Sequence, residues 1–372
     1  MGIFMAKKYR EQNITTISEL IERHHGTNAV ILGVFCQIVI QLVIISLQYI
    51  AGGSILHAIM PEVFDFKTGM LVSAITFISI TFIGGMWSAS LTNVLNIILI
   101  YFGIVVATFI QLDKVGGIDT LAKTLPANVP WFSFTEGVGL KTIASWVITL
   151  VTVNLSLQSI LQISLGAKDA ATARKGFVWG GIIMLPVGVL AALLGICAKS
   201  MYPDAQAALA LPQVIVGLQP VLAADVSTAC NLLLSAGTLF SNDIYKRFIN
   251  PKCSDAKQLT MMRLCIVISG VLTLGMAMGV SSILGTIMIG LSLTAAFSVI
   301  VIVALFFPQY SCKAAGFWTL LVGFIMLVLW QFVPAVRIFP NVIYMEWFAC
   351  ILTYAVVAVL QPGKKLAADT AE

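Results

Sequence analysis

Long apolar runs follow one another along almost the whole sequence, and this succession constrains the fold more than any other feature. Only 10% of the 372 residues are charged, while 59% are hydrophobic. A soluble domain needs more polar residues to cover its surface, so the composition indicates a polytopic membrane protein. A helix of roughly 20 apolar residues crosses a bilayer core about 30 Å thick. This length predicts ten spans, at residues 30–59, 68–87, 90–112, 142–165, 176–200, 213–241, 261–281, 284–308, 315–334 and 341–361.

The apolar runs do not alternate with polar residues at a period of two, which argues for helices and against a membrane β-barrel. We therefore predict an all-α polytopic membrane protein with about ten transmembrane helices. With the N-terminus inside, most of the 21 Lys and Arg residues fall in cytoplasmic segments. This positive-inside bias predicts a multi-pass protein of the cell membrane with both termini in the cytoplasm. The basic residues stand in short loops and form no stripe, so no nucleic acid partner is expected.

The segment Val221–Phe248 combines an apolar run with polar residues that should lie at membrane depth. Ala224, Ser227 and Thr228 stand at positions i, i+3 and i+4, so one carbonyl and two hydroxyls can face a single point. An alkali cation prefers several hard oxygen ligands of this kind. In the structural alternative, both hydroxyls bond back to carbonyls of their own helix. The spacing taken alone favours that alternative.

The sequence around these residues resembles the sodium:solute symporter family. Ala224, Ser227 and Thr228 are followed by Ser235–Arg247 (SAGTLFSNDIYKR), which is similar to the end of the family's eighth core helix. The resemblance implies that these three residues bind sodium as the coupling ion, with no other metal and no other cofactor. Asp225 stands where the family usually has an apolar residue. It either faces the cavity or lies near the outer water, and the nearby proline favours the outer position.

Several other phrases resemble the same family. Ile14–Gly26 is similar to the loop after the second core helix, Gln48–Gly53 to the end of the third, and Gln158–Asp169 to part of the sixth. Thr92–Asn96 stands where the family commonly has Thr-Asp-x-x-Gln, and the Asp often serves a second cation site. An amide offers one oxygen but no charge, which weakens a second cation site at Asn93.

Polar side chains form a stripe along the first predicted span. Gln37, Gln41 and Gln48 fall on one face of a helix. This face either lines a hydrated solute path or forms hydrogen bonds between helices, which are worth about 0.6–2 kcal/mol each in a membrane. We give both interpretations equal weight.

A second stripe occurs in the span 142–165, where Asn154, Gln158 and Gln162 stand at i, i+4 and i+8. On one continuous helix these side chains share a face. The candidate residues that bind substrate or line the cavity are Gln48, Asn154, Gln158 and Asp225.

The resemblance implies a core of two inverted five-helix repeats. It divides the chain into a cytoplasmic N-terminal segment (1–28), a transporter core with core helices three to ten (29–308), two peripheral transmembrane helices (309–362) and a cytoplasmic tail (363–372). The first two core helices are then lacking, so we expect an N-terminally incomplete core. The missing helices would be explained by an incomplete reading frame or by an N-terminal part that is encoded separately.

The N-terminal segment carries its own local signals. The motif Thr16–Glu19 predicts a capping box that opens a short cytoplasmic helix. His24 and His25 follow this helix, and we expect both to be solvated.

The function that the resemblance implies is sodium-coupled symport. The protein would be a secondary active transporter that imports a small polar organic solute across the lipid bilayer by alternating access. The sequence has no P-loop, no His cluster at metal spacing and no serine-elbow motif, so we do not expect an enzyme. Two alternatives are a solute-sensing membrane domain and a truncated fragment without independent activity. The sequence does not name the solute.

Overall fold

The computed structural model describes residues 2–12, 14–133, 135–204, 221–279 and 283–361, except for the side chains of 85–95, 221–228 and 283–285. The described residues form helices, and no strand occurs among them. The predicted all-α fold class is confirmed. In chain order the helices are α1 (Ala6–Glu11), α2 (Ile17–His25), α3 (Thr27–Ile59), α4 (Phe66–Val115), α5 (Gly117–Thr124), α6 (Leu140–Ser156), α7 (Gln158–Gly166), α8 (Ala170–Met201), α10 (Val221–Thr238), η1 (Leu239–Ile249), α11 (Asp255–Ala277), α12 (Ile283–Ser292), α13 (Thr294–Phe306), η2 (Pro308–Tyr310), α14 (Lys313–Phe332), η3 (Pro334–Val336) and α15 (Val342–Leu360).

The chain is a polytopic membrane protein. Eight segments of the described chain are long and apolar enough to cross a bilayer, and the bent pair α6 and α7 adds a ninth if it counts as one span. Residues 68–87 and 90–112, predicted as two spans, both fall within α4. The predicted span 213–241 is described from Val221 onward, as α10 and the start of η1.

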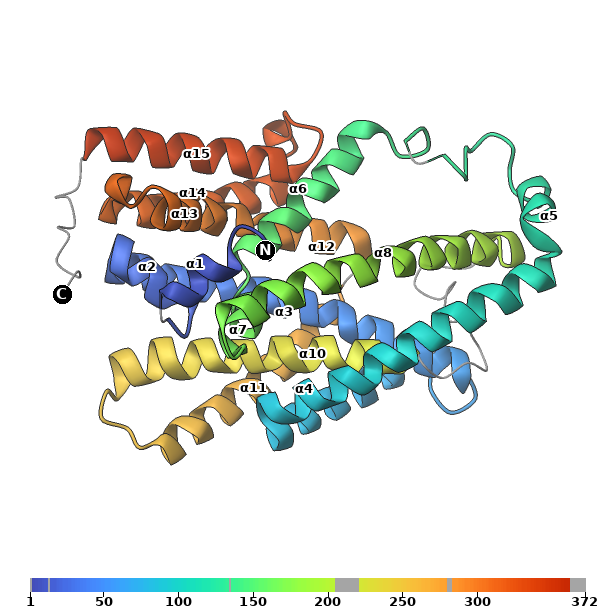
Figure 1. Ribbon diagram of the computed structural model, residues 1–372, viewed down its shortest axis with the longest axis horizontal. Coiled ribbons are helices and arrows are strands. Elements are labelled where there is room, and N and C mark those ends of the chain that lie inside the picture. Colours follow the sequence, from blue (N-terminus) through green and yellow to red (C-terminus); the bar gives the residue numbers. More distant parts are fainter. Residues whose placement is uncertain (1, 13, 134, 205–220, 280–282, 362–372) are drawn as a thin grey trace.

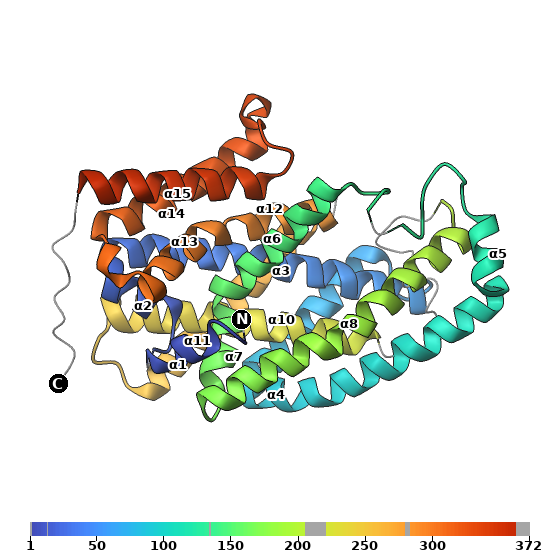
Figure 2. The same ribbon diagram turned by 45° about the horizontal axis from the view of Figure 1, so that its top comes forward.

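Helix α3 runs through the middle of the bundle (Figures 1 and 2). It contacts α4, α10 and α11 as well as α12 and α14. The helices α13, α14 and α15 pack against one another and lie together in both views. Helix α3 therefore connects α4, α10 and α11 with the group formed by α13, α14 and α15, which it contacts through α14.

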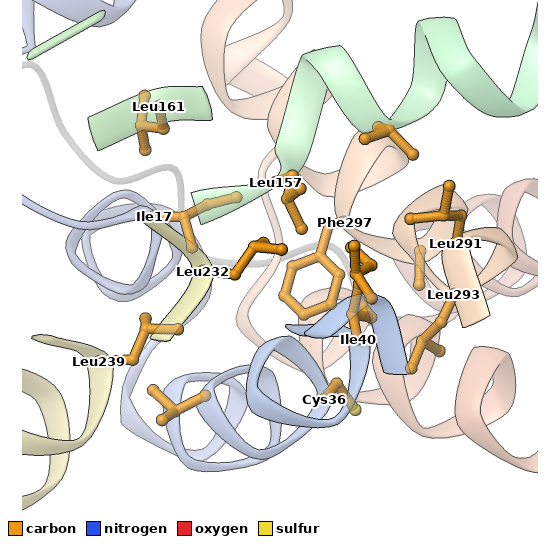
Figure 3. Close-up of a cluster of buried hydrophobic side chains, with 14 of the residues drawn as sticks. Ile17, Cys36, Ile40, Leu157, Leu161, Leu232, Leu239, Leu291, Leu293 and Phe297 are labelled. Atoms are coloured by element: carbon orange, nitrogen blue, oxygen red, sulfur yellow. The ribbon is translucent and has the colours of Figure 1, made fainter. Parts of the chain in front are cut away.

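A cluster of apolar side chains fixes the helices around α3 (Figure 3). The ring of Phe297 on α13 lies near Ile40 of α3, Leu157 between α6 and α7, and Leu232 of α10. These side chains are buried, and each such residue contributes about 1.5–3 kcal/mol to the free energy of folding. The cluster therefore positions α3, α10, α13 and the junction of α6 with α7, which come from distant parts of the sequence.

The N-terminal helices are packed against this bundle. The side chains of Tyr9, Ile17 and Leu20 are completely buried. The predicted capping box does not form, because Glu19 Oε2 accepts a hydrogen bond of 2.8 Å from the backbone N–H of Thr15, one residue before the N-cap Thr16. The hydroxyl of Thr16 makes no cap, because it donates a hydrogen bond to a buried carboxyl group on η1.

The expectation that His25 is solvated was wrong. Its side chain is buried, and its Nδ1–H donates to the main-chain carbonyl of Cys312 at 2.9 Å. The ring of Tyr354 on α15 meets the imidazole edge-on, with 5.8 Å between the ring centroids. The end of α2 therefore packs against α14 and α15. The imidazole of His25 can be buried there because most of its ring is apolar and its polar edge has a hydrogen-bond partner.

Candidate functional site

The span formed by α6 and α7 is broken at Leu157, where the helix axis bends by 51°. Leu157 has an extended backbone, with φ −76° and ψ 128°. No proline or glycine lies between Val151 and Ile160, so this break is not a proline kink. A broken helix at membrane depth frees backbone groups that need other partners. Asn154 and Gln158 therefore lie on separate helices, and the prediction of one shared face was wrong because it assumed a continuous helix.

The side chain of Gln37 on α3 bridges this break. Its Nε2 donates to the carbonyl of Ser156, the last residue of α6, at 2.9 Å. Its Oε1 accepts a longer hydrogen bond of 3.4 Å from the N–H of Gln158, the first residue of α7. Gln158 in turn accepts from the backbone N–H of Ile17 at 2.8 Å through its Oε1. One buried amide thus binds both ends of the interrupted span.

The span formed by α12 and α13, which stays helical through Leu293, lies next to this break. Ser156 Oγ lies 3.1 Å from the carbonyl oxygen of Thr294. Ser298 Oγ donates to the carbonyl of Thr152 at 3.0 Å and lies 3.1 Å from Ser156 Oγ. All four polar side chains are buried. We call Thr152, Ser156, Thr294 and Ser298 the hydroxyl cluster, and such hydroxyls beside interrupted helices can bind an ion or a polar solute.

Helix α1 covers another side of the break. Tyr9 Oη donates to the carbonyl of Leu155, two residues before the bend. Arg10 Nη1 donates to the carbonyl of Leu165 near the end of α7 at 2.8 Å. Both carbonyls lie in the last turn of a helix, where no N–H group of the same helix is available to donate to them. The N-terminal helix therefore satisfies backbone groups of α6 and α7.

The remaining polar residues of the two predicted stripes differ in their surroundings. Gln48 is half-buried. Asn154 is also half-buried, and its Nδ2 donates to the carbonyl of Leu150 on its own helix at 2.9 Å. Gln41 is completely buried, and neither of its amide atoms has a hydrogen-bond partner within the described part of the chain. In the first stripe, Gln37 therefore forms hydrogen bonds between helices, which was one of the two interpretations. The amide of Gln41 could bind a polar group outside the described residues, as the other interpretation requires.

The predicted sodium ligands Ala224, Ser227 and Thr228 lie on α10, together with Asp225. Their side chains, and that of Asn93 on α4, lie outside the described residues. The backbone of α10 packs against α3, α4 and α7. The sodium site and the second cation site therefore stay predictions.

The sequence reasoning missed the hydroxyl cluster. Thr152 and Ser156 stand at i and i+4, and so do Thr294 and Ser298. Two small hydroxyl residues on one face of each span were a visible signal. The pairing of the two faces was not visible, because it depends on the packing of α6 against α13.

Comparison with known proteins identifies the family of this chain. The model of the sodium:solute symporter family matches residues 1–323. This chain belongs to the sodium:solute symporter family. The membership confirms the resemblance found in the sequence around residues 224–247.

Individual symporter relatives are distant. The chain is 25% identical over 315 residues to the sodium/glucose cotransporter of Vibrio parahaemolyticus, covering 72% of this chain and 57% of that protein. It is 24% identical over 317 residues to the high-affinity choline transporter 1 of Caenorhabditis elegans, covering 76% and 53%. It is 22% identical over 343 residues to the high-affinity proline transporter PutP of Bacillus subtilis, covering 86% and 71%. The chain thus spans about half the length of most curated relatives that it matches.

A solved structure shares the fold of this symporter family member. It is the substrate-bound, outward-open state of a Na⁺-coupled sialic acid symporter. The TM-score is 0.76 at 15% sequence identity, and the match covers 96% of this chain and 80% of the other. At this identity the likeness concerns the arrangement of the helices and not the bound solute.

Proposed function

We propose that this protein acts in sodium-coupled symport, importing a small polar organic solute by alternating access. The observation that carries the proposal is the helix break at Leu157, with the buried hydroxyl cluster beside it. Interrupted helices of this kind offer polar groups to a solute or ion inside the bilayer. Membership of a symporter family supports the same function. We place the protein in the cell membrane with both termini in the cytoplasm.

For the coupling ion we propose sodium, held by the carbonyl of Ala224 and the hydroxyls of Ser227 and Thr228. The spacing of these residues lets three oxygens face one point of α10. They would form only part of a site, because an alkali ion takes more ligands than three. A second cation site at Asn93 would lack a charged ligand.

The solute class follows from the polar groups that are available. Gln48, Asn154 and Gln158, with Asp225, are the side chains that we assign to the substrate cavity. Uncharged amides suit several polar solutes, and the relatives are named for glucose, mannose, choline and proline. We therefore propose a small polar organic solute without choosing among sugars, amino acids and quaternary amines.

The first test is binding of radiolabelled sodium to the purified full chain in lipid nanodiscs. We expect saturable binding that is lost in the Ser227→Ala, Thr228→Ala double variant. Thr238→Ala on the same helix is the matched control, because the Thr238 hydroxyl bonds the carbonyl of Leu234 on its own helix at 2.9 Å. Binding that survives the double variant would contradict the assigned ion site.

The second test is uptake into proteoliposomes with an inward sodium gradient. Glucose, mannose, choline and proline form the first panel, and sodium-stimulated accumulation of any panel member would support symport. Binding of a solute without uptake would favour a sensing domain. A chain that binds neither sodium nor solute would favour a fragment without independent activity.

A further inference from the structure

A carboxyl group lies inside the membrane-spanning part of the bundle, on a helix that does not form the break at Leu157. Glu346 belongs to α15, which is a candidate span, and its side chain is completely buried. A charged side chain at membrane depth is expensive and is found there with a partner or a function. Glu346 therefore needs an explanation that packing alone does not give.

The neighbours of Glu346 come from α13, α14 and α15. A Cβ added at Gly323 of α14 would lie 3.3 Å from Glu346 Oε2 and 2.9 Å from the Cβ of Ala296 on α13. The thiol of Cys350, one turn further along α15, lies 3.9 Å from Oε2 and 3.9 Å from the carbonyl oxygen of Thr319. Gly323 thus leaves the space that the carboxyl group fills between three helices.

This pocket offers almost nothing to a negative charge. Glu346 Oε1 has no hydrogen-bond partner among the described residues, and the thiol near Oε2 is a weak donor. The ion pairs of the described chain, Lys7–Glu11 and Arg247–Glu22, do not include Glu346. The titratable groups that face it are the thiols of Cys36 on α3 and Cys350 on α15, and neither supplies a positive charge.

A metal cation does not suit the pocket either. Alkali and alkaline-earth ions take several oxygen ligands. The polar neighbour of Glu346 within the described residues is the thiol of Cys350, a soft group that these hard cations do not favour. Within the described residues no group of three or more His, Cys, Asp or Glu side chains could hold a metal ion. A proton is the one cation that needs a single oxygen.

We propose that Glu346 is a proton-binding site, occupied by a proton when α15 packs on α13 and α14. The bound proton forms the O–H bond of a neutral carboxylic acid, which removes the cost of burying a charge. Breaking that bond passes the proton to water and leaves a carboxylate on Glu346. Release therefore requires α14 and α15 to separate from α13 far enough to admit water.

The attachment of α15 to α6 links this site to the hydroxyl cluster. Trp347, next to Glu346, donates from Nε1 to Thr152 Oγ1 at 3.0 Å. Tyr344 Oη donates to the carbonyl of Lys141 at 2.7 Å, at the other end of α6. A movement of α6 pulls on α15 on both sides of Glu346. The proton site itself stands on its own contacts and does not depend on the proposed transport function.

The test is infrared spectroscopy of the purified full chain in nanodiscs. A protonated carboxyl has a carbonyl band that an ionised carboxylate lacks. We expect this band at about pH 8, where exposed carboxyls with pKa values of about 4 are ionised. Glu346→Gln should lower the intensity of the band by one carboxyl, and Glu136→Gln, at an exposed loop residue, should leave it unchanged.

The outcome does not depend on whether a variant folds. A wild-type protein without any protonated carboxyl band at about pH 8 would overturn the proposal by itself. So would a band of unchanged intensity in a folded Glu346→Gln protein. Glu346→Gln keeps a neutral side chain of the same shape, so we expect its melting temperature to stay close to that of the wild type. Two results together would contradict the proposal and indicate an ionised carboxylate with a bound cation. These are a large loss of melting temperature in Glu346→Gln and a rise in the melting temperature of the wild type, but not of the variant, on adding sodium.

Discussion

The hydroxyl of Thr16 donates a hydrogen bond of 2.9 Å to Oδ1 of Asp243, although 227 positions separate the two residues. Thr16 precedes α2, and Asp243 lies in the π-helical segment η1, beyond the predicted span 213–241. Both side chains are buried. Burial raises the pKa of Asp243 to about 6, and the hydrogen bond from Thr16 opposes this shift. The bond joins the N-terminal segment to the end of the helix that carries the predicted sodium ligands.

We expect Thr16→Val to lower the free energy of unfolding by about 1–3 kcal/mol, because it leaves a buried carboxyl oxygen without its donor. Unfolding can be followed by the reaction of a fluorogenic dye with cysteine thiols, since six of the seven cysteines are buried. Thr76→Val is the control, because its exposed hydroxyl bonds only Val72 of its own helix. The Thr16→Val, Asp243→Asn double variant should lose less than the sum of the single variants, and strict additivity would contradict a direct coupling.

The buried imidazole of His25 predicts a loss of stability in acid. Burial lowers the pKa of His25 to about 4, against about 6.5 in an unfolded chain. Between these values the unfolded state binds the proton more strongly, so stability is complete above about pH 6.5 and falls as the pH drops toward 4. The shift corresponds to at most about 3 kcal/mol. The decline due to His25 is measured as the difference in melting temperature between the wild type and a variant without the imidazole across this range.

The variant His25→Asn isolates this effect. Asparagine keeps a donor for the carbonyl of Cys312 but has no proton to gain, so the variant should flatten the decline. His57→Asn is the matched control, because His57 Nδ1 also contacts a main-chain oxygen, that of Phe64 at 2.9 Å, but its side chain is half-exposed. Asp243 acts in the opposite direction, since its raised pKa favours the folded state at low pH. An unchanged pH profile in His25→Asn would exclude His25 as the cause.

The membrane class and the symporter family could be read from the sequence because both depend on local signals. Apolar length predicts a span without reference to any neighbour. The phrase ending in Asp243-Ile-Tyr245 carries the family likeness in consecutive residues. These features need no knowledge of which helices pack together.

The site geometry depends on contacts between distant residues and could not be read in the same way. The break at Leu157 has no proline or glycine to announce it, and Gln37 stabilises it from a helix 119 positions earlier. His25 looked like a polar loop residue, and only the packing of α14 and α15 buries it. Glu346 carries no local signal beyond a charge in an apolar run.

The bridge made by Gln37 predicts local opening at the break when it is removed. Gln37→Leu leaves the carbonyl of Ser156 and the N–H of Gln158 without a partner, at a cost of about 1–3 kcal/mol for each buried group. We expect faster hydrogen exchange of the peptide that contains residues 157–160, measured by mass spectrometry. Gln48→Leu on the same helix is the control, because Gln48 makes no side-chain hydrogen bond within the described part of the chain. Equal exchange in the wild type and Gln37→Leu would show that the bridge does not hold the break.

The crossing of α3 and α4 predicts a steric effect at a pair of glycines. A Cβ added at Gly69 would lie 2.8 Å from the carbonyl oxygen of Gly53 and 3.1 Å from its Cα, so the two helix backbones touch there. Gly69→Ala must push the helices apart, and we expect a loss of about 1–3 kcal/mol. Gly180→Ala on α8 is the matched control, since beyond the backbone of its own helix no atom lies within 4 Å of its added Cβ. That control should be neutral or stabilising by about 0.5–1 kcal/mol, because alanine favours a helix interior over glycine. A Gly69→Ala protein as stable as Gly180→Ala would mean that α3 and α4 do not pack at this distance.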